Sequence, residues 1–168
     1  MRGFIISCIV LCSVIVIVFS SIAFIAFPLR YKNDIRDASA EFGVDAVLIA
    51  SVILAESRFR TDAVSSKGAV GLMQIMPQTA RFIASQMNIK DFDLRDARTN
   101  IFFGTFYLRY LLDKFEDTRT TLMAYNAGEG RVRGWLDGAK RLETTPFPET
   151  NAYVERVLNA KNFYRWRM

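Results

Sequence analysis

Residues 55–78 read A-E-S-R-F-R-T-D-A-V-S-S-K-G-A-V-G-L-M-Q-I-M-P-Q. They follow a strongly apolar run, residues 46–55, and place one carboxyl group, that of Glu56, at its end. Ionising a carboxyl group at the edge of a hydrophobic helix costs free energy, so we expect a raised pKa for Glu56. Such a group can donate a proton near neutral pH, as a general acid in glycoside cleavage must. The plainer interpretation is a solvated glutamate at a helix end, and the rest of the chain decides between the two.

The patterning after the first 32 residues is helical almost throughout. Capping residues and apolar spacing predict helices from 33 or 34 to 42, 45 to 55, 77 to 87, 93–96 to 115, 117 or 118 to 126, 130 to 136 and 149 to 167. No alternating pair of strands is present, although residues 65–73 could hold a small hairpin-like loop. We therefore expect one globular domain over residues 33–168 that is all-α, or α+β with minimal β.

Three further segments accompany Glu56-Ser57 and the loop after it. They are G-A-V-G-L-M-Q-I-M-P at 68–77, A-Y-N-A-G at 124–128 and E-T-N-A-Y-V at 149–154. In order and spacing, the four blocks resemble the signature blocks of the soluble lytic transglycosylase family, over roughly residues 33–160. The resemblance implies a lysozyme-like catalytic domain that acts on peptidoglycan.

The resemblance also implies roles for individual residues. Glu56 is expected to be the catalytic acid and base, and the expected substrate-binding residues are Ser57, Ser65, Gln74, Met76, Tyr125, Asn126 and Tyr153. Some alternatives stay open: a register slip would exchange Ser65 for Ser66, and Met76 could belong to the core. Tyr153 is expected to orient Glu56 by a hydrogen bond. Gly68 and Gly71 are expected to let the backbone approach the glycan closely.

The expected reaction uses a single carboxyl group. Asp62 and Glu129 are the nearest other candidates, and we interpret both as solvated or exposed. The resemblance then implies cleavage of the β-1,4 bond between N-acetylmuramic acid and N-acetylglucosamine without water, which leaves a 1,6-anhydro end. The alternatives are a hydrolytic goose-type lysozyme and a glycan-binding module that has lost its activity.

Residues 4–27 contain neither a charge nor a proline, and as a helix they are long enough to span a bilayer. We predict an uncleaved membrane anchor there and a connector over residues 28–32. A signal peptide cleaved after Ser21-Ile22-Ala23, or a lipoprotein modified at Cys8, are the alternatives. Arg30, Lys32 and Arg36 slightly favour a cytoplasmic domain, whereas the expected cell-wall substrate requires an extracytoplasmic one. We give more weight to the expected substrate and therefore predict a single-pass membrane protein whose catalytic domain lies on the extracytoplasmic side, facing the cell wall.

The composition narrows the remaining possibilities. The chain has no histidine, and its two cysteines, Cys8 and Cys12, lie in the apolar run, so a zinc or histidine-based site is excluded and no metal or cofactor is expected. The net charge of +5 suits an anionic partner such as the cell wall or lipid head groups. Lys161, Arg165 and Arg167 alternate with aromatic residues, but we interpret them as a packed C-terminal helix rather than a nucleic-acid site. We expect a monomer.

Overall fold

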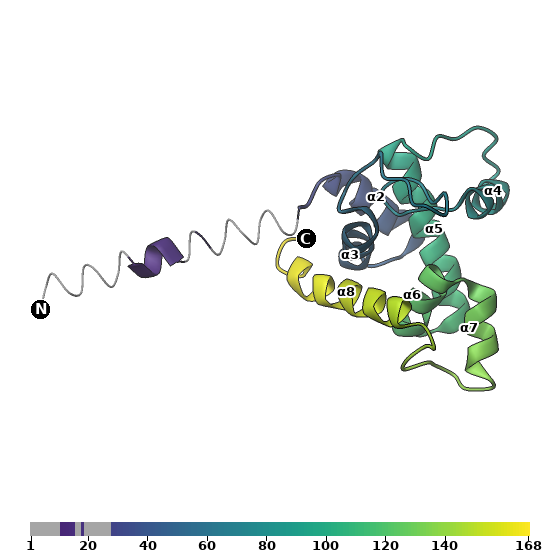
Figure 1. Cartoon of the computed structure of the whole chain (residues 1–168). Helices are drawn as coiled ribbons and strands as arrows, with labels where there is room; N and C mark the ends of the chain where they lie inside the picture. The colour runs from purple at the N-terminus through teal and green to yellow at the C-terminus, as the bar shows by residue number, and fades with distance from the viewer. Residues whose placement is uncertain (1–10, 16–17, 19–27) are drawn as a thin grey trace, which may run out of the picture.

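The computed structural model describes residues 11–15, 18 and 28–168 (Figure 1). Residues 28–168 form an all-helical domain, built from α2 (Lys32–Phe42), α3 (Ala46–Ser57), α4 (Pro77–Gln86), α5 (Ala97–Phe115), α6 (Thr118–Ala127), α7 (Glu129–Leu136) and α8 (Pro148–Tyr164). In this part of the chain the β structure is limited to two isolated bridges, Val64 with Val70 and Val70 with Ile75. The predicted all-helical class with minimal β is therefore confirmed.

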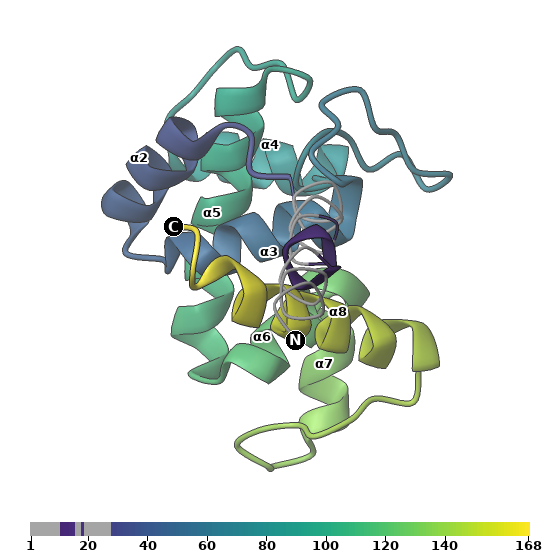
Figure 2. The same ribbon diagram turned by 90° about the vertical axis from the view of Figure 1, so that its left-hand side faces the viewer.

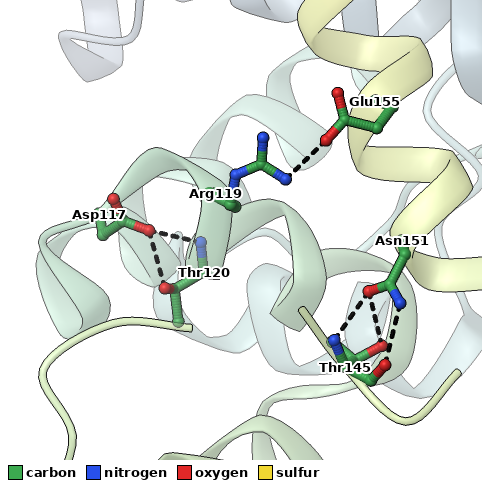
Figure 3. Close-up of polar contacts among 6 residues, drawn as sticks. All are labelled: Asp117, Arg119, Thr120, Thr145, Asn151 and Glu155. Carbon is green, nitrogen blue, oxygen red and sulfur yellow. Dashed lines mark hydrogen bonds and ion pairs between the residues drawn. The ribbon is translucent and has the colours of Figure 1, made fainter. Parts of the chain in front are cut away.

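The helix starts follow from capping residues that the sequence offers. Asp45 accepts from the Val47 N–H at 2.9 Å, and Asp96 accepts from the Thr99 N–H at 2.8 Å. Asp117 caps α6 in the same way through the N–H of Thr120 (Figure 3). Each carboxylate satisfies a backbone donor that has no partner inside its helix.

Helix α2 differs from the expectation of a cap at residue 33 or 34. It begins at Lys32, and Tyr31 precedes it without a side-chain capping bond. A tertiary contact holds this first turn instead, because the Lys32 ammonium donates to the Arg167 carbonyl at 2.9 Å. Contacts with the far end of the chain could not be read from the local pattern.

Helix α3 is the central element of the domain. Its residues from Leu48 to Ile53 are all buried, and α8 lies alongside it (Figures 1 and 2). Helix α5 packs against α2 on one side and α6 on the other. Because the middle of α3 is fully buried, a polar side chain in its last turn, such as Glu56, lies in a partly dehydrated position.

The loop between α3 and α4 is fixed by one buried side chain of α5. The Asn100 amide donates to the Val70 carbonyl at 2.9 Å and to the Leu94 carbonyl at 2.8 Å, and its oxygen accepts from the Met73 N–H at 2.7 Å. Gly71 has a φ of +81°, and a Cβ there would overlap Asn100 and the Leu94 carbonyl. Glycine is therefore required at 71 for packing against Asn100 of α5, and the close approach of this backbone to a glycan stays a prediction.

The predicted anchor, residues 4–27, lies outside the described residues except for 11–15 and 18. In the ranges that are described, no helix has the length and apolar character needed to cross a bilayer. The division into anchor, connector and domain stays a prediction.

Candidate active site

A cleft of about 460 Å³ opens beside the C-terminal end of α3. Its walls come from the α3–α4 loop, the end of α6, helix α7 and the start of α8, which are far apart in sequence. The lining residues are Glu56, Ser65, Lys67, Ala69, Gln74, Met76, Tyr125, Asn126, Ala127, Arg131, Phe147, Glu149 and Thr150. The four sequence blocks thus meet at one cavity.

Glu56 is half-buried in the last turn of α3 and faces this cleft. The pKa of Glu56 is raised from 4.5 to about 7, chiefly because burial takes water from the charged carboxylate. The Tyr153 hydroxyl and the charge of Arg156 act in the opposite direction and offset the effect of burial only in part. Near neutral pH the carboxyl group is therefore shared between its protonated and ionised forms, as a group that both gives and takes a proton requires.

Tyr153 lies on α8, which packs against α3, and its side chain is 1% exposed. Its hydroxyl group lies near Glu56 and lowers the pKa of that carboxyl as a hydrogen-bond donor does. The geometry falls outside that of a regular hydrogen bond, and no other described residue supplies the hydroxyl with a partner. Tyr153 therefore does not line the cleft; it lies behind Glu56, where it can act on the carboxyl group.

Tyr125 and Asn126 close α6 beside the cleft. The Tyr125 hydroxyl donates to the Met73 carbonyl at 2.8 Å, which ties α6 to the α3–α4 loop. Burial and the charge of Glu56 raise the pKa of Tyr125 well above its ordinary value, so the ring stays neutral. Asn126 is exposed, and its Oδ1 accepts from the Thr150 hydroxyl at 2.9 Å, which joins the end of α6 to the start of α8.

Gln74 has a left-handed backbone, with φ of 49°. Its Nε2 donates to the carbonyls of Ala63 at 3.1 Å and Gly71 at 2.9 Å. The amide nitrogen is thereby committed to the loop, which leaves Oε1 as the atom that can accept a hydrogen bond from a ligand. A fixed amide oxygen on the wall of a cleft suits recognition of an N–H or O–H donor.

Ser65 and Met76 lie on the same loop. Ser65 lines the cleft and Ser66 does not, and the Ser65 Oγ accepts from the Ala69 N–H at 3.0 Å, which leaves its own proton for a ligand. Met76 is 40% exposed at the cleft, so the alternative assignment of Met76 to the core is wrong. Met73 takes that core position, with no exposed surface.

Ser57 is not brought to the cleft, contrary to the expectation that it binds substrate. Its side chain is buried, and its hydroxyl donates to the Leu72 carbonyl at 2.8 Å, with the Ile53 carbonyl at 3.2 Å. A serine facing inward at the end of a buried helix finds backbone acceptors before it can reach a ligand. Ser57 instead joins the end of α3 to the α3–α4 loop, which lines the cleft.

The other carboxyl groups divide into three cases. Asp62 is exposed and absent from the cleft lining, as the sequence suggested. Glu129 was expected to be exposed, but its side chain is only 21% exposed and pairs with Lys114 at 2.7 Å and with Arg133. Glu149 lines the cleft, and sequence reasoning did not consider it as a functional residue. Glu149 is the first residue of the E-T-N-A-Y-V block at 149–154, and its place in that block could have indicated a functional role.

The wall of the cleft formed by α7 and the segment before α8 was also not predicted from the sequence. Arg131 and Phe147 face the cleft from there, with the Arg131 guanidinium 5.9 Å from the centre of the Phe147 ring. Asn151 holds this segment in place, because its side chain accepts from the Thr145 N–H at 2.8 Å and donates to the Thr145 carbonyl at 2.9 Å (Figure 3). The loop composition carries no signal of this arrangement.

An ion pair also joins the start of α6 to α8. The Arg119 guanidinium lies 2.7 Å from the Glu155 carboxylate (Figure 3). A glutamate with a raised pKa that faces an open cleft is the kind of general acid that enzymes cleaving glycosidic bonds use.

Comparison with known proteins agrees with that class. The family described as the transglycosylase SLT domain matches residues 33–147. The soluble lytic murein transglycosylase of Escherichia coli K12 is 36% identical over 154 residues, which are 84% of this chain and 24% of that protein. The membrane-bound lytic murein transglycosylase C of Glaesserella parasuis is 31% identical over 169 residues, 81% of this chain and 46% of that protein. The chain therefore belongs to the transglycosylase SLT domain family, and it spans about a quarter of the length of the soluble relatives.

Solved structures show the same similarity. The 70 kDa soluble lytic transglycosylase of Escherichia coli has a TM-score of 0.75 and 36% identity, over 83% of this chain and 25% of that one. Its complex with bulgecin A gives a TM-score of 0.76. An inactive glutamate-to-glutamine mutant of the Pseudomonas aeruginosa enzyme Slt gives a TM-score of 0.74 with 31% identity.

Proposed function

We propose that the protein is a lytic transglycosylase that cleaves the β-1,4 bond between N-acetylmuramic acid and N-acetylglucosamine in peptidoglycan without consuming water. The observation that carries the proposal is Glu56, a carboxyl group with a pKa of about 7 that faces an open cleft. Family membership and the names of the relatives support the substrate class. The inactive glutamate-to-glutamine mutant of a relative supports dependence on one carboxyl group.

In the proposed reaction Glu56 acts twice. Its protonated form gives its proton to the glycosidic oxygen while the bond from that oxygen to C1 of muramic acid breaks. The resulting carboxylate takes the proton of the muramic C6 hydroxyl as O6 bonds to C1, which restores the acid and forms the 1,6-anhydro ring. A nucleophile already attached to the same sugar gains from proximity, so the step needs a fixed sugar more than a second carboxylate.

The cleft residues supply that fixation in our proposal. Ser65 and Gln74 offer a hydroxyl donor and an amide acceptor for the sugar substituents, and Met76 gives it an apolar contact. Tyr125 and Asn126 hold the sugar from the end of α6. Tyr153 acts through Glu56, as a positioning residue, since it is buried behind the carboxyl group.

One observation favours a second candidate, a hydrolytic lysozyme. The sequence suggested no second carboxyl group that could activate water, but Glu149 faces the same cleft as Glu56. A carboxylate base across from the acid is how inverting glycosidases use water. The two reactions leave different muramic ends, so product analysis separates them.

Digestion of purified peptidoglycan in ¹⁸O-labelled water tests both candidates. For the full chain in detergent, we expect mass spectrometry to find anhydro ends without label, with Glu149→Gln retaining the same product. Stoichiometric ¹⁸O at C1, lost in Glu149→Gln, would make the protein a lysozyme. Bound but uncleaved glycan would identify a binding module.

We further propose that residues 4–27 stay attached as a single membrane anchor, with the catalytic domain on the extracytoplasmic side. The uncharged length of that segment supports this, and some relatives are named as membrane-bound. Fractionation and the intact mass of the mature protein test the anchor. A soluble species that begins at Phe24 would mean cleavage after Ala23 and no anchor.

A further inference from the structure

The two ends of the described domain are bound to each other. The Tyr164 hydroxyl donates to the Pro28 carbonyl at 2.6 Å, at the residue where the domain begins. Lys32 and Arg36 of α2 donate to the carbonyls of Arg167 at 2.9 Å and Met168 at 3.1 Å. Figure 1 shows the C-terminus beside the start of the domain. The C-terminal residues therefore lie where the chain arrives from its apolar N-terminal segment.

The surface at this point combines an exposed indole with positive charge. Trp166 is 93% exposed, more than any other large hydrophobic side chain among the described residues. Residues 28–33 and 163–168 contain Arg30, Lys32, Arg165 and Arg167 but no aspartate or glutamate. We call Arg30, Lys32, Arg165, Trp166 and Arg167 the basic end patch. An exposed indole among cations is unusual on a surface that meets only water, because it leaves a large apolar group hydrated.

The basic end patch and the cleft lie at opposite ends of α8. Thr150, in the first turn of the helix, lines the cleft, whereas Tyr164, its last residue, contacts Pro28. The fourteen residue steps from Thr150 to Tyr164 correspond to roughly 21 Å along a helix axis. Helix α8 also packs against the buried helix α3, which supports it between the patch and the cleft.

We propose that the basic end patch is a membrane-contact surface that binds anionic lipid head groups, with the Trp166 indole at the interface. The proposal rests on the anchor proposed above, which would bring this end of the domain to the bilayer. Tryptophan favours the head-group level of membranes, and clustered lysine and arginine are attracted to anionic lipids. Helix α8 then acts as a strut that holds the cleft about 20 Å from the bilayer and open toward the wall.

Lipid fits this patch better than a protein or nucleic acid does. The apolar run of residues 4–27 ends one residue before Pro28, so the patch borders the segment that would enter the bilayer. A partner protein would have to bind between the domain and that membrane. Nucleic acid would require an unobstructed basic face. Nucleic acid is also not expected on the extracytoplasmic side, where we place the domain.

The two tryptophans of the chain allow a direct test. The Trp135→Phe variant retains Trp166 as its only indole. The Trp166→Phe variant retains only Trp135 and serves as the matched control. The Trp135 ring centre lies 5.3 Å from that of Phe147, which lines the cleft. The full chain is placed in nanodiscs that contain brominated phosphatidylcholine, with or without phosphatidylglycerol. We expect bromine to quench the fluorescence of Trp166 at least ~3-fold more than that of Trp135. The emission of Trp166 should also be blue-shifted from that of an indole in water.

The charges are tested in the same system. Arg30→Gln with Arg165→Gln should reduce quenching of Trp166 when phosphatidylglycerol is present, and should leave quenching unchanged in phosphatidylcholine alone. Cleavage of soluble glycan by this variant should match the wild type, because both arginines are remote from the cleft.

The outcomes separate the two proposals. Equal quenching of Trp166 and Trp135 in a chain that stays in the nanodisc would overturn the contact surface and leave the anchor standing. A chain that leaves the nanodisc as a soluble protein would overturn both. If Arg30→Gln with Arg165→Gln changed the quenching of Trp166 equally with and without phosphatidylglycerol, binding of anionic head groups would be excluded.

Discussion

Glu56 and Glu129 are two half-buried glutamates of one domain with opposite pKa shifts. Burial raises the pKa of both carboxyl groups, but for Glu56 the Tyr153 hydroxyl and Arg156 offset it only in part, and the pKa is about 7. At Glu129 the hydrogen bond and charge of Lys114, with Tyr110 and Arg133, outweigh burial, and the pKa is lowered. Burial alone therefore does not make a proton donor; burial without a closely paired cation does.

The comparison also separates two uses of a carboxylate at a helix terminus. Glu129 stands in the first turn of α7, where a negative charge is favourable, and its ion pairs join α5 to α7. Glu56 stands in the last turn of α3, where the helix offers no such stabilisation, and it faces a cleft. One group stabilises the fold in its charged form, and the other is left with a proton to give.

Replacing each glutamate by glutamine should separate their effects on activity most strongly. Glu56→Gln keeps the shape of the side chain but removes the proton donor, so we expect turnover of purified peptidoglycan to fall by at least ~10³-fold with the fold intact. Glu129→Gln and Asp62→Ala should each cost less than ~10-fold. Circular dichroism controls for folding. A Glu56→Gln variant with a tenth of wild-type turnover would exclude Glu56 as the acid.

The sequence predicted the raised pKa of Glu56 more successfully than it predicted the surroundings of that carboxyl group. An apolar run that ends in a single glutamate indicates a dehydrated carboxyl group, and the N-caps at Asp45 and Asp117 follow from local pattern. Long-range contacts decide the rest. Ser57 turns inward because the Leu72 carbonyl lies within reach, and Glu129 is covered because Lys114 lies opposite it. Arg131 and Phe147 reach the cleft through a loop whose position depends on Asn151.

The two glutamates should also give stability opposite dependences on pH. The folded pKa of Glu56 is raised, so its contribution is complete below pH 4.5 and is lost as pH rises through about 7, by up to about 3 kcal/mol. Glu56→Gln should therefore unfold at higher denaturant concentration than wild type at pH 8, and nearly equally at pH 4.

Glu129 should behave in the reverse sense, since its folded pKa is lowered. Its contribution is present above its ordinary pKa and disappears as pH falls through the folded value, so Glu129→Gln should destabilise the protein at pH 7 and converge with wild type in acid. Chemical denaturation across pH measures both variants. If the stability of the two variants relative to wild type changed with pH in the same direction, the pKa shifts of Glu56 and Glu129 would not differ in sign.

Smaller effects should follow from altering the neighbours rather than the glutamates. Tyr153→Phe removes a hydroxyl group that lowers the pKa of Glu56, so the alkaline fall of the activity profile, which should lie near pH 7 in wild type, should move to higher pH. Lys114→Met should raise the pKa of Glu129 and leave that profile unchanged. A Tyr153→Phe variant with reduced activity but an unmoved profile would assign Tyr153 a purely structural role.

The most direct test is titration of the glutamate side chains by carbon-13 NMR. Glutamate carboxyl carbons are followed across pH, and the Glu56 and Glu129 signals are assigned from their loss in Glu56→Gln and Glu129→Gln. We expect Glu56 to titrate near pH 7 and Glu129 below 4.5. A Glu56 signal that titrates at or below 4.5 would contradict the claim that the cleft holds this carboxyl group ready to donate a proton.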